Sequence, residues 1–249
     1  MITTSAFAGI GGLELGISAA IPETDVRYQI EIDRYCNAVL EKHWPETTRY
    51  RDIKTVRPED IEGTECLLAG FPCTDISKAS PTGTGLAGER SGLFWEVKRL
   101  VRSVPTIEWV VLENVPGLLS GRGMGSILAS FHECGFSYVE WDTLSSAAIG
   151  ACHRRDRIFI ICCRDAPNSV LQGLQEWEGV DRPWAYTAVA GSSGWDSEPP
   201  IRPLDDGISP RVVNRRAAIK ALGNSVQPQV AYFVGLRLKA LMNKEASNE

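Results

Sequence analysis

A cysteine follows a proline directly after an apolar run, in the segment "LLAGFPCTDIS" of residues 67–77. Two interpretations of Cys73 are open. Most free cysteines behave as small hydrophobic residues that fill a core strand. A thiol placed just past the carboxyl end of a buried strand can instead act as a nucleophile, because an open α/β sheet presents its reactive groups at that edge.

A carboxylate and two arginines occupy comparable positions. Glu113 stands at the end of the apolar run in "VVLENVPG", and a buried carboxylate costs several kcal/mol unless it is partnered. The segment "HRRDRIFII" places Arg155 and Arg157 on alternate residues before a strand, hence on one face of it. We therefore expect Cys73 and Glu113 to face one crevice, and we expect the arginine pair to have an anionic or polar partner.

A glycine-rich turn, "FAGIGG" at residues 7–12, leads from a strand into a helix. Glycine lets backbone N–H groups approach a ligand at a helix N-terminus, although a purely structural turn looks the same. Glu31 ends the next strand, where doubly wound folds hold ribose hydroxyls. Together these features indicate a cofactor that contains adenosine. The glycine spacing differs from G-x-G-x-x-G, which argues against NAD.

The strands and helices around these groups must position them. Along the chain, short apolar runs alternate with segments of helical periodicity. This alternation predicts an α/β fold with a doubly wound, mostly parallel sheet. The expected strands cover residues 2–9, 26–32, 65–71, 108–115, 138–146 and 157–163, the last two as a pair, and the expected helices cover residues 12–21, 34–44, 93–104, 125–134 and 227–242.

The composition is that of a globular chain of 249 residues, 43% hydrophobic and 23% charged. Seven cysteines with no CxxC pair indicate reduced thiols in a cytosolic setting and no metal site. The first residues do not resemble a signal peptide, and no apolar run approaches the length of a membrane span. The net charge of −5 argues mildly against general nucleic-acid coating. It leaves room for local basic clusters such as residues 153–157 and 211–220.

Six segments occur in an order and at a spacing that resemble the DNA (cytosine-5) methyltransferase family, in its short phage-type or minimal bacterial form. They are "FAGIGG", "GFPCTDIS", "GERSGLFWE", "LENVPGLL", "HRRDRIFII" and "LGNSVQP". The resemblance implies a Rossmann-like fold that uses S-adenosyl-L-methionine. It also implies methyl transfer to carbon 5 of a flipped cytosine through a covalent Cys73 adduct, with S-adenosyl-L-homocysteine as the product.

The resemblance also implies residue roles. Cys73, Glu113 and Arg155 would be catalytic: Cys73 attacks carbon 6, Glu113 holds ring nitrogen 3, and Arg155 favours the thiolate. Glu31 would bind the ribose, Asp52 and Ile53 would flank adenine, and Leu93 would lie at the methionine end. The complete cofactor-binding set is Phe7, Ala8, Gly9, Gly11, Gly12, Glu31, Ile32, Asp52, Ile53, Pro72, Leu93, Asn224, Ser225 and Val226. The residues expected to contact DNA are Thr74, Ser77, Lys78, Arg90, Arg157, Arg211, Arg215 and Arg216.

Residues 1–164 with 214–249 are expected to form the catalytic domain, and residues 165–213 a reduced, irregular target-recognition segment that reads roughly two to four base pairs. Residues 74–92 are expected to form a lid over the flipped base. The expected partner is double-stranded DNA, and a restriction endonuclease of the same system is a candidate. We expect a monomer that contacts no membrane, in the cytoplasm of a bacterium or a phage-infected host.

Four positions depart from the family's usual pattern: Ser5 replaces an acid, Ile32 an aromatic, and Thr74 and His153 each a glutamine. Neither the motifs nor these departures reveal the target sequence.

Three alternatives remain. A cytosine-5 methyltransferase acting on tRNA usually shows Pro-Pro-Cys and a Cys-Phe-Thr element, whereas this chain has Phe-Pro-Cys and "IICCRDAPN". A nucleotide-binding oxidoreductase explains the glycine turn but neither Pro72-Cys73 nor the "ENV" segment at 113–115. A catalytically inactive DNA-binding homologue is disfavoured by the presence of Cys73, Glu113 and Arg155, although Thr74 and the small recognition segment leave it open.

Overall fold

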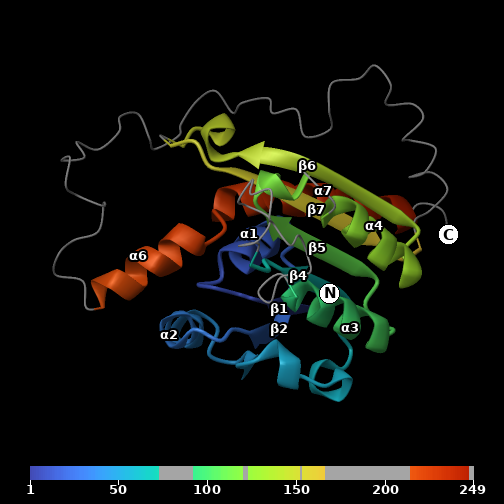
Figure 1. Cartoon of the computed structure of the whole chain (residues 1–249), viewed down its shortest axis with the longest axis horizontal. Helices are drawn as coiled ribbons and strands as arrows, with labels where there is room; N and C mark the ends of the chain where they lie inside the picture. Colours follow the sequence, from blue (N-terminus) through green and yellow to red (C-terminus); the bar gives the residue numbers. More distant parts are fainter. Residues whose placement is uncertain (73–91, 120–122, 152, 166–213, 247–249) are drawn as a thin grey trace.

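The structure is a computed structural model that describes residues 1–72, 92–119, 123–151, 153–165 and 214–246. Its centre is a seven-stranded sheet with the order β3-β2-β1-β4-β5-β7-β6 (Figure 1). The strands are β1 (Ile2–Ala6), β2 (Asp25–Ile30), β3 (Thr48–Tyr50), β4 (Cys66–Ala69), β5 (Trp109–Asn114), β6 (Tyr138–Ser145) and β7 (Asp156–Cys163). The five strands from β3 to β5 are parallel, and β7 lies antiparallel between β5 and β6. The expected doubly wound, mostly parallel sheet is confirmed.

Helices cover both faces of this sheet. They are α1 (Gly12–Ala20), α2 (Arg34–His43), α3 (Leu93–Ser103), α4 (Gly123–Glu133), α6 (Arg215–Asn224) and α7 (Pro228–Ala246). Short 3₁₀ turns are η1 (Ile53–Thr55), η2 (Pro58–Ile61), η4 (Pro116–Leu119) and η5 (Ser146–Ile149). In the described part of the chain, no helix combines the length and the apolar character needed to cross a membrane.

The core has two layers because each central strand buries side chains on both faces. Leu67 and Val110 pack on the side of α3 and α4, whereas Leu68 and Val111 pack on the side of α1 and α7. Helices α1 and α7 approach closely because small residues meet there. A Cβ added to Gly16 would lie 2.4 Å from both the Ala231 Cβ and the Pro228 carbonyl oxygen.

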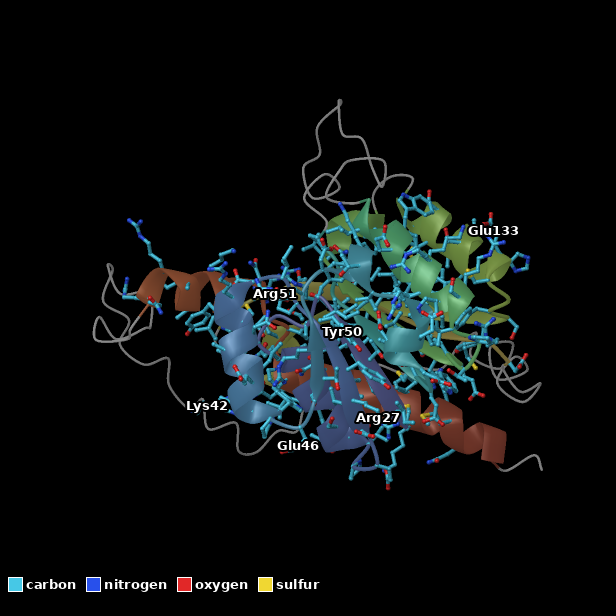
Figure 2. The ribbon with its side chains drawn as sticks, turned by 90° about the horizontal axis from the view of Figure 1, so that it is seen from below. Arg27, Lys42, Glu46, Tyr50, Arg51 and Glu133 are labelled. Carbon is cyan, nitrogen blue, oxygen red and sulfur yellow. The ribbon has the colours of Figure 1, made fainter. Side chains whose placement is uncertain are left out.

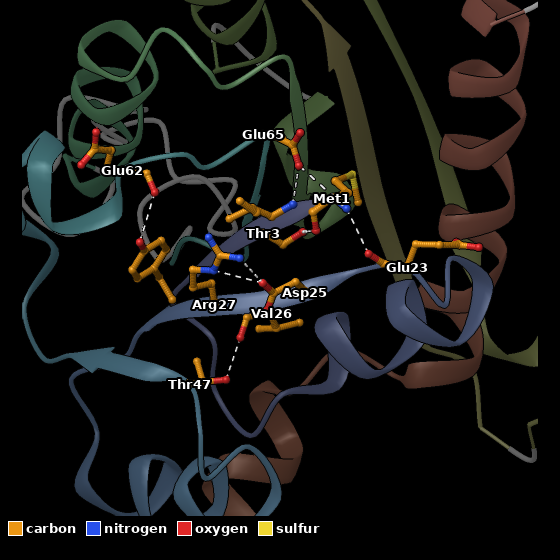
Figure 3. A network of polar contacts seen from close by, with 11 residues as sticks. Met1, Thr3, Glu23, Asp25, Val26, Arg27, Thr47, Glu62 and Glu65 are labelled. Atoms are coloured by element: carbon orange, nitrogen blue, oxygen red, sulfur yellow. Dashed lines mark hydrogen bonds and ion pairs between the residues drawn. The ribbon is translucent and has the colours of Figure 1, made fainter.

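The amino ends of the parallel strands are fixed by a polar network that lies away from the strands' carboxyl ends (Figure 3). The Met1 ammonium donates to the Glu23 carbonyl at 3.0 Å, and the Arg27 guanidinium pairs with Asp25 at 2.6 Å. The Thr47 hydroxyl donates to the Val26 carbonyl at 2.7 Å, which ties the segment before β3 to β2. This edge carries structural bonds, so the opposite, carboxyl edge is the place to look for a site.

The chain order reverses between β1 and β4, since β2 and β3 extend the sheet to one side of β1 and the later strands extend it to the other. In open α/β sheets, ligands bind at such a reversal, outside the carboxyl ends of the strands. The glycine turn after β1, Glu31 after β2 and Glu113 on β5 all belong to this edge.

Candidate active site

Neighbouring parallel strands bring the segment before Cys73 to Glu113. Strands β4 and β5 pair in parallel, with Ala69 opposite Leu112, so their carboxyl ends meet at one edge. Asn114 then donates its side-chain N–H to the Phe71 carbonyl at 3.0 Å, and Asn114 is only 4% exposed. This bond holds the segment that ends at Pro72, one residue before Cys73, against the end of β5. Cys73 itself lies outside the described residues.

Glu113 is a buried carboxyl that pairs with Arg157. Its Oε1 lies 2.9 Å from the Arg157 Nε, and Glu113 is 8% exposed. Burial raises the pKa of Glu113 to about 7, although the charges of Arg157 and Arg155 act to lower it. A Cβ at Gly70 would lie 3.3 Å from Oε2, so glycine at this position keeps the second oxygen clear. Near neutral pH this carboxyl can therefore either donate or accept a proton.

The two arginines bind different partners. Arg157, expected to contact DNA, lies on Glu113 instead of pointing to a separate surface. Arg155, expected to be catalytic, donates from Nη1 to the Gly223 carbonyl and from Nη2 to the Ser225 carbonyl, both at 2.8 Å. The alternate spacing predicted polar or anionic partners for both, and the structure shows them.

The glycine turn has the backbone that a ligand-binding loop requires. Phe7, Gly9 and Gly11 all have positive φ, at 58°, 57° and 86°. The Gly9 N–H donates to one oxygen of Glu31 at 2.8 Å, and the Asp33 N–H donates to the other at 2.7 Å. A Cβ built on Gly9 meets no atom within 4 Å, so open space lies beside the turn. A carboxylate and an open backbone thus lie together where ribose hydroxyls could bind.

The "GNSV" segment lies against this turn. A Cβ on Gly12 would lie 2.1 Å from the Val226 carbonyl oxygen and 2.7 Å from the Ser225 Oγ. Residues some 210 positions apart in the chain are therefore in direct contact. Asn224 ends α6 immediately before this contact.

The remaining cofactor candidates lie around the same edge. Ile32 is 66% exposed, and the Arg51 guanidinium donates to the Ile32 carbonyl at 2.7 Å. Arg51 follows β3 in the chain and lies near one end of α2, whereas Lys42 lies near the other end of that helix (Figure 2). Asp52 caps η1 by accepting from the Lys54 N–H at 3.0 Å, while Ile53 is buried. Ala8 is buried in the turn, Leu93 begins α3, and Pro72 is half-buried.

Five of the eight residues expected to contact DNA lie outside the described residues: Thr74, Ser77, Lys78, Arg90 and Arg211. Residues 74–91 of the expected lid and 166–213 of the expected recognition segment lie outside them as well. Arg215 and Arg216 form the first turn of α6, which lies beside α2 (Figure 1). Sequence reasoning missed Lys220 on the same helix, whose Nζ pairs with Asp33 at 2.9 Å. The basic cluster at 211–220 indicated that Lys220 could bind an anionic group, but the cluster does not identify Asp33 as that group.

The described cysteines are unsuited to nucleophilic attack. Cys36, Cys66, Cys134, Cys162 and Cys163 are all buried. Burial raises the pKa of Cys36 and of Cys66 to about 12, so at neutral pH both remain thiols. None of the five competes with Cys73 for a nucleophilic role.

A family model for C-5 cytosine-specific DNA methylases matches residues 1–183. The chain belongs to this family. It is 32% identical over 170 residues to the type II methyltransferase M2.BsuMI of Bacillus subtilis, which covers 65% of this chain and 41% of the relative. It is 30% identical over 192 residues to M.CviJI of Paramecium bursaria Chlorella virus IL3A, covering 73% of this chain and 50% of that protein. The chain thus spans half or less of the length of these curated relatives.

Solved structures confirm the fold of this C-5 methylase family member. The Dnmt2 methyltransferase of S. pombe superimposes with a TM-score of 0.57 at 17% identity, over 74% of this chain and 57% of that one. A DNMT2 variant from Spodoptera frugiperda gives a TM-score of 0.56 at 19% identity, over 66% of this chain and 50% of that one. The Rossmann-like methyltransferase fold expected from the motifs is confirmed.

Proposed function

We propose that this chain transfers a methyl group from S-adenosyl-L-methionine to carbon 5 of cytosine in DNA. The observation that carries the proposal is Glu113. It is a buried carboxyl with a pKa of about 7, paired with Arg157 and bordered by the segment that leads into Cys73. Membership in the C-5 methylase family supports the same reaction.

The carboxyl edge fits the proposed cofactor. Open space beside Gly9 and the carboxylate of Glu31 suit a ribose, and the exposed Ile32 offers an apolar surface for a base. Residues 224–226 would border the methionine end, because Ser225 and Val226 lie against Gly12. When bound, S-adenosyl-L-methionine supplies the electrophilic methyl group that carbon 5 accepts, and it leaves as S-adenosyl-L-homocysteine.

Cys73 and Glu113 divide the work on the base. The Cys73 thiolate, a few per cent of the thiol near pH 7, forms a bond to carbon 6. As the electron pair of the 5,6 double bond moves into the ring, the neutral carboxyl of Glu113 donates its proton to nitrogen 3. Arg157 stabilises the resulting carboxylate. After methylation, carbon 5 loses its proton to water, the bond between sulfur and carbon 6 breaks to release the Cys73 thiolate, and Glu113 recovers its proton from nitrogen 3.

The finer expectations belong to the same proposal. A cytosine inside a duplex hides carbon 6, so the base must flip out to reach Cys73. We propose double-stranded DNA as the substrate, read over two to four base pairs by residues 165–213. We also propose a monomer in the cytoplasm of a bacterium or a phage-infected host, with a restriction endonuclease of the same system as candidate partner.

The test is trapping with oligonucleotides that contain 5-fluorocytosine, in the presence of S-adenosyl-L-methionine. Fluorine cannot leave as a proton does, so an active chain stays covalently attached to its target. The native chain should form an adduct with a DNA pool, and Cys73→Ser should not. An adduct with an RNA pool instead would identify an RNA methyltransferase. No adduct with either pool, from a chain that binds the cofactor, would indicate an inactive homologue.

A further inference from the structure

Arg155 joins two segments that are far apart in the chain. It stands immediately before β7, and its guanidinium donates to the carbonyls of Gly223 and Ser225 at 2.8 Å each. These carbonyls end α6, and the last carbonyls of a helix lack partners within the helix and carry partial negative charge. A planar guanidinium with two N–H groups can satisfy both at once.

The same junction, residues 224–226, is held from its other side by the glycine turn. The Val226 carbonyl oxygen and the Ser225 Oγ lie against Gly12, so closely that a Cβ there would overlap both. The Ser225 hydroxyl also donates to the Val226 carbonyl at 2.9 Å. The junction is therefore enclosed between Arg155 and the cofactor turn.

Arg157 stands two residues further along and pairs with Glu113. The entry to β7 thus fixes the carboxyl proposed to act on cytosine through one arginine, and the junction proposed to border the cofactor through the other.

We propose that Arg155 is a positioning residue: it holds the 224–226 junction at a fixed distance from Glu113 and touches neither cytosine nor the Cys73 thiol. This inference rests on the proposed function and replaces the expectation that Arg155 is catalytic. Its effect should therefore fall on cofactor binding, before any chemistry on the base.

The neighbouring Arg154 supplies a matched control. Its side chain is 81% exposed and its Nε pairs with Asp156 at 2.9 Å. Replacing Arg154 by methionine removes the same charge from the same segment and leaves the bonds of Arg155 intact. Methionine at position 155 retains most of the apolar stem of arginine, so it removes the two hydrogen bonds with little change in packing.

The experiment compares the native chain with Arg155→Met, Arg155→Lys and Arg154→Met. Calorimetry with S-adenosyl-L-homocysteine gives the Kd, and methylation assays give KM for the cofactor, kcat and their pH profile. We expect Arg155→Met to raise Kd and KM at least tenfold. At saturating cofactor, kcat should stay within about threefold of native and the pH profile should be unchanged. Lysine cannot bind both carbonyls as a planar fork, so Arg155→Lys should fall between native and Arg155→Met. Arg154→Met should stay within twofold of native.

A native-like Kd in folded Arg155→Met would overturn the proposal, and so would an equal loss in Arg154→Met. A fall in kcat with a shifted pH profile and an unchanged KM would show a catalytic role instead. If Arg155→Met does not fold, a native-like Kd in Arg155→Lys overturns the proposal. The binding of S-adenosyl-L-homocysteine is measured without DNA. The effect of Arg155→Met on its Kd can therefore be determined even if the native chain methylates nothing. A native chain that does not bind this product would refute both proposals.

Discussion

Replacing Gly12 by alanine should weaken cofactor binding by a factor that the structure sets. The added Cβ would lie 2.1 Å from the Val226 carbonyl oxygen, whereas ordinary van der Waals contact begins near 3.4 Å. Two of the three atoms it meets belong to the backbone, so no rotamer change relieves the overlap. The 224–226 junction must therefore move by about 1 Å, and overpacking of this kind costs about 1–3 kcal/mol.

The effect on the Kd for the cofactor depends on whether this free energy lowers the stability of the fold or the affinity of the site. If the folded chain keeps residues 224–226 in place, the strain lowers its stability. If the junction moves away, the strain is released and the cofactor loses its border. We expect the junction to move, because it joins two helices and begins at the exposed Asn224. A loss of about 1–3 kcal/mol raises Kd by roughly 5- to 150-fold.

Calorimetry with S-adenosyl-L-homocysteine measures this directly. Gly125→Ala is the control, since a Cβ at Gly125 on α4 meets no atom within 4 Å and should leave Kd unchanged. Circular dichroism verifies that both variants are folded. A folded Gly12→Ala that binds the product within twofold of native would show that the contact between the turn and the junction does not shape the cofactor site.

Three further perturbations test other parts of the structure. Burial raises the pKa of Glu14 from 4.5 to about 7, so between these pH values the folded chain keeps a proton that the unfolded chain releases. The contribution of this group to the free energy of unfolding should therefore fall by about 3 kcal/mol between pH 4.5 and pH 7. Urea denaturation at pH 5 and pH 8 should show a smaller fall in Glu14→Gln, and equal falls would contradict the assignment. Asn114→Ala removes the donor to the Phe71 carbonyl and should lower single-turnover methylation at least tenfold with product binding unchanged; native-like turnover would refute this role. Glu140→Gln leaves the partly buried Arg237 without its carboxylate and should cost up to about 3–5 kcal/mol of stability, largely recovered when both become methionine. An unchanged denaturation midpoint would contradict this.

The central strands were predictable from the sequence, because strands that are buried on both faces consist of apolar residues. Residues 66–69 and 109–112 are apolar without interruption, as strands covered on both faces must be. Strand β3 (Thr48–Tyr50) was not predicted, because three residues are too few to show a periodicity. This edge strand is defined by its backbone pairing with β2, which the sequence does not reveal. Helix α6 was also missed, because its basic first turn was interpreted as a surface cluster.

The site was predictable at the level of strand ends and no finer. A carboxylate after an apolar run must lie at the carboxyl edge, and Glu113 does. Which arginine pairs with Glu113 depends on the register of β5 against β7, where Glu113 faces Phe159. The spacing of Arg155 and Arg157 allows either pairing. The bonds of Arg155 to residues 68 and 70 positions away follow only from the packing of α6 and α7.

One departure from the family pattern acquires a different meaning in three dimensions. Ser5 on β1 stands where an acid is usual, which suggests a carboxyl lost beside the glycine turn. Glu14, in the first turn of α1, is fully buried with Ser5 and Gln29 beside its carboxyl. Neither of its oxygens has a hydrogen-bond partner among the residues that the structure places, and burial favours the protonated form. A carboxyl is therefore present in this region, on the next element of the chain. A comparison of aligned positions alone counts Ser5 as a loss, whereas the packing of α1 on β1 brings the Glu14 carboxyl beside Ser5.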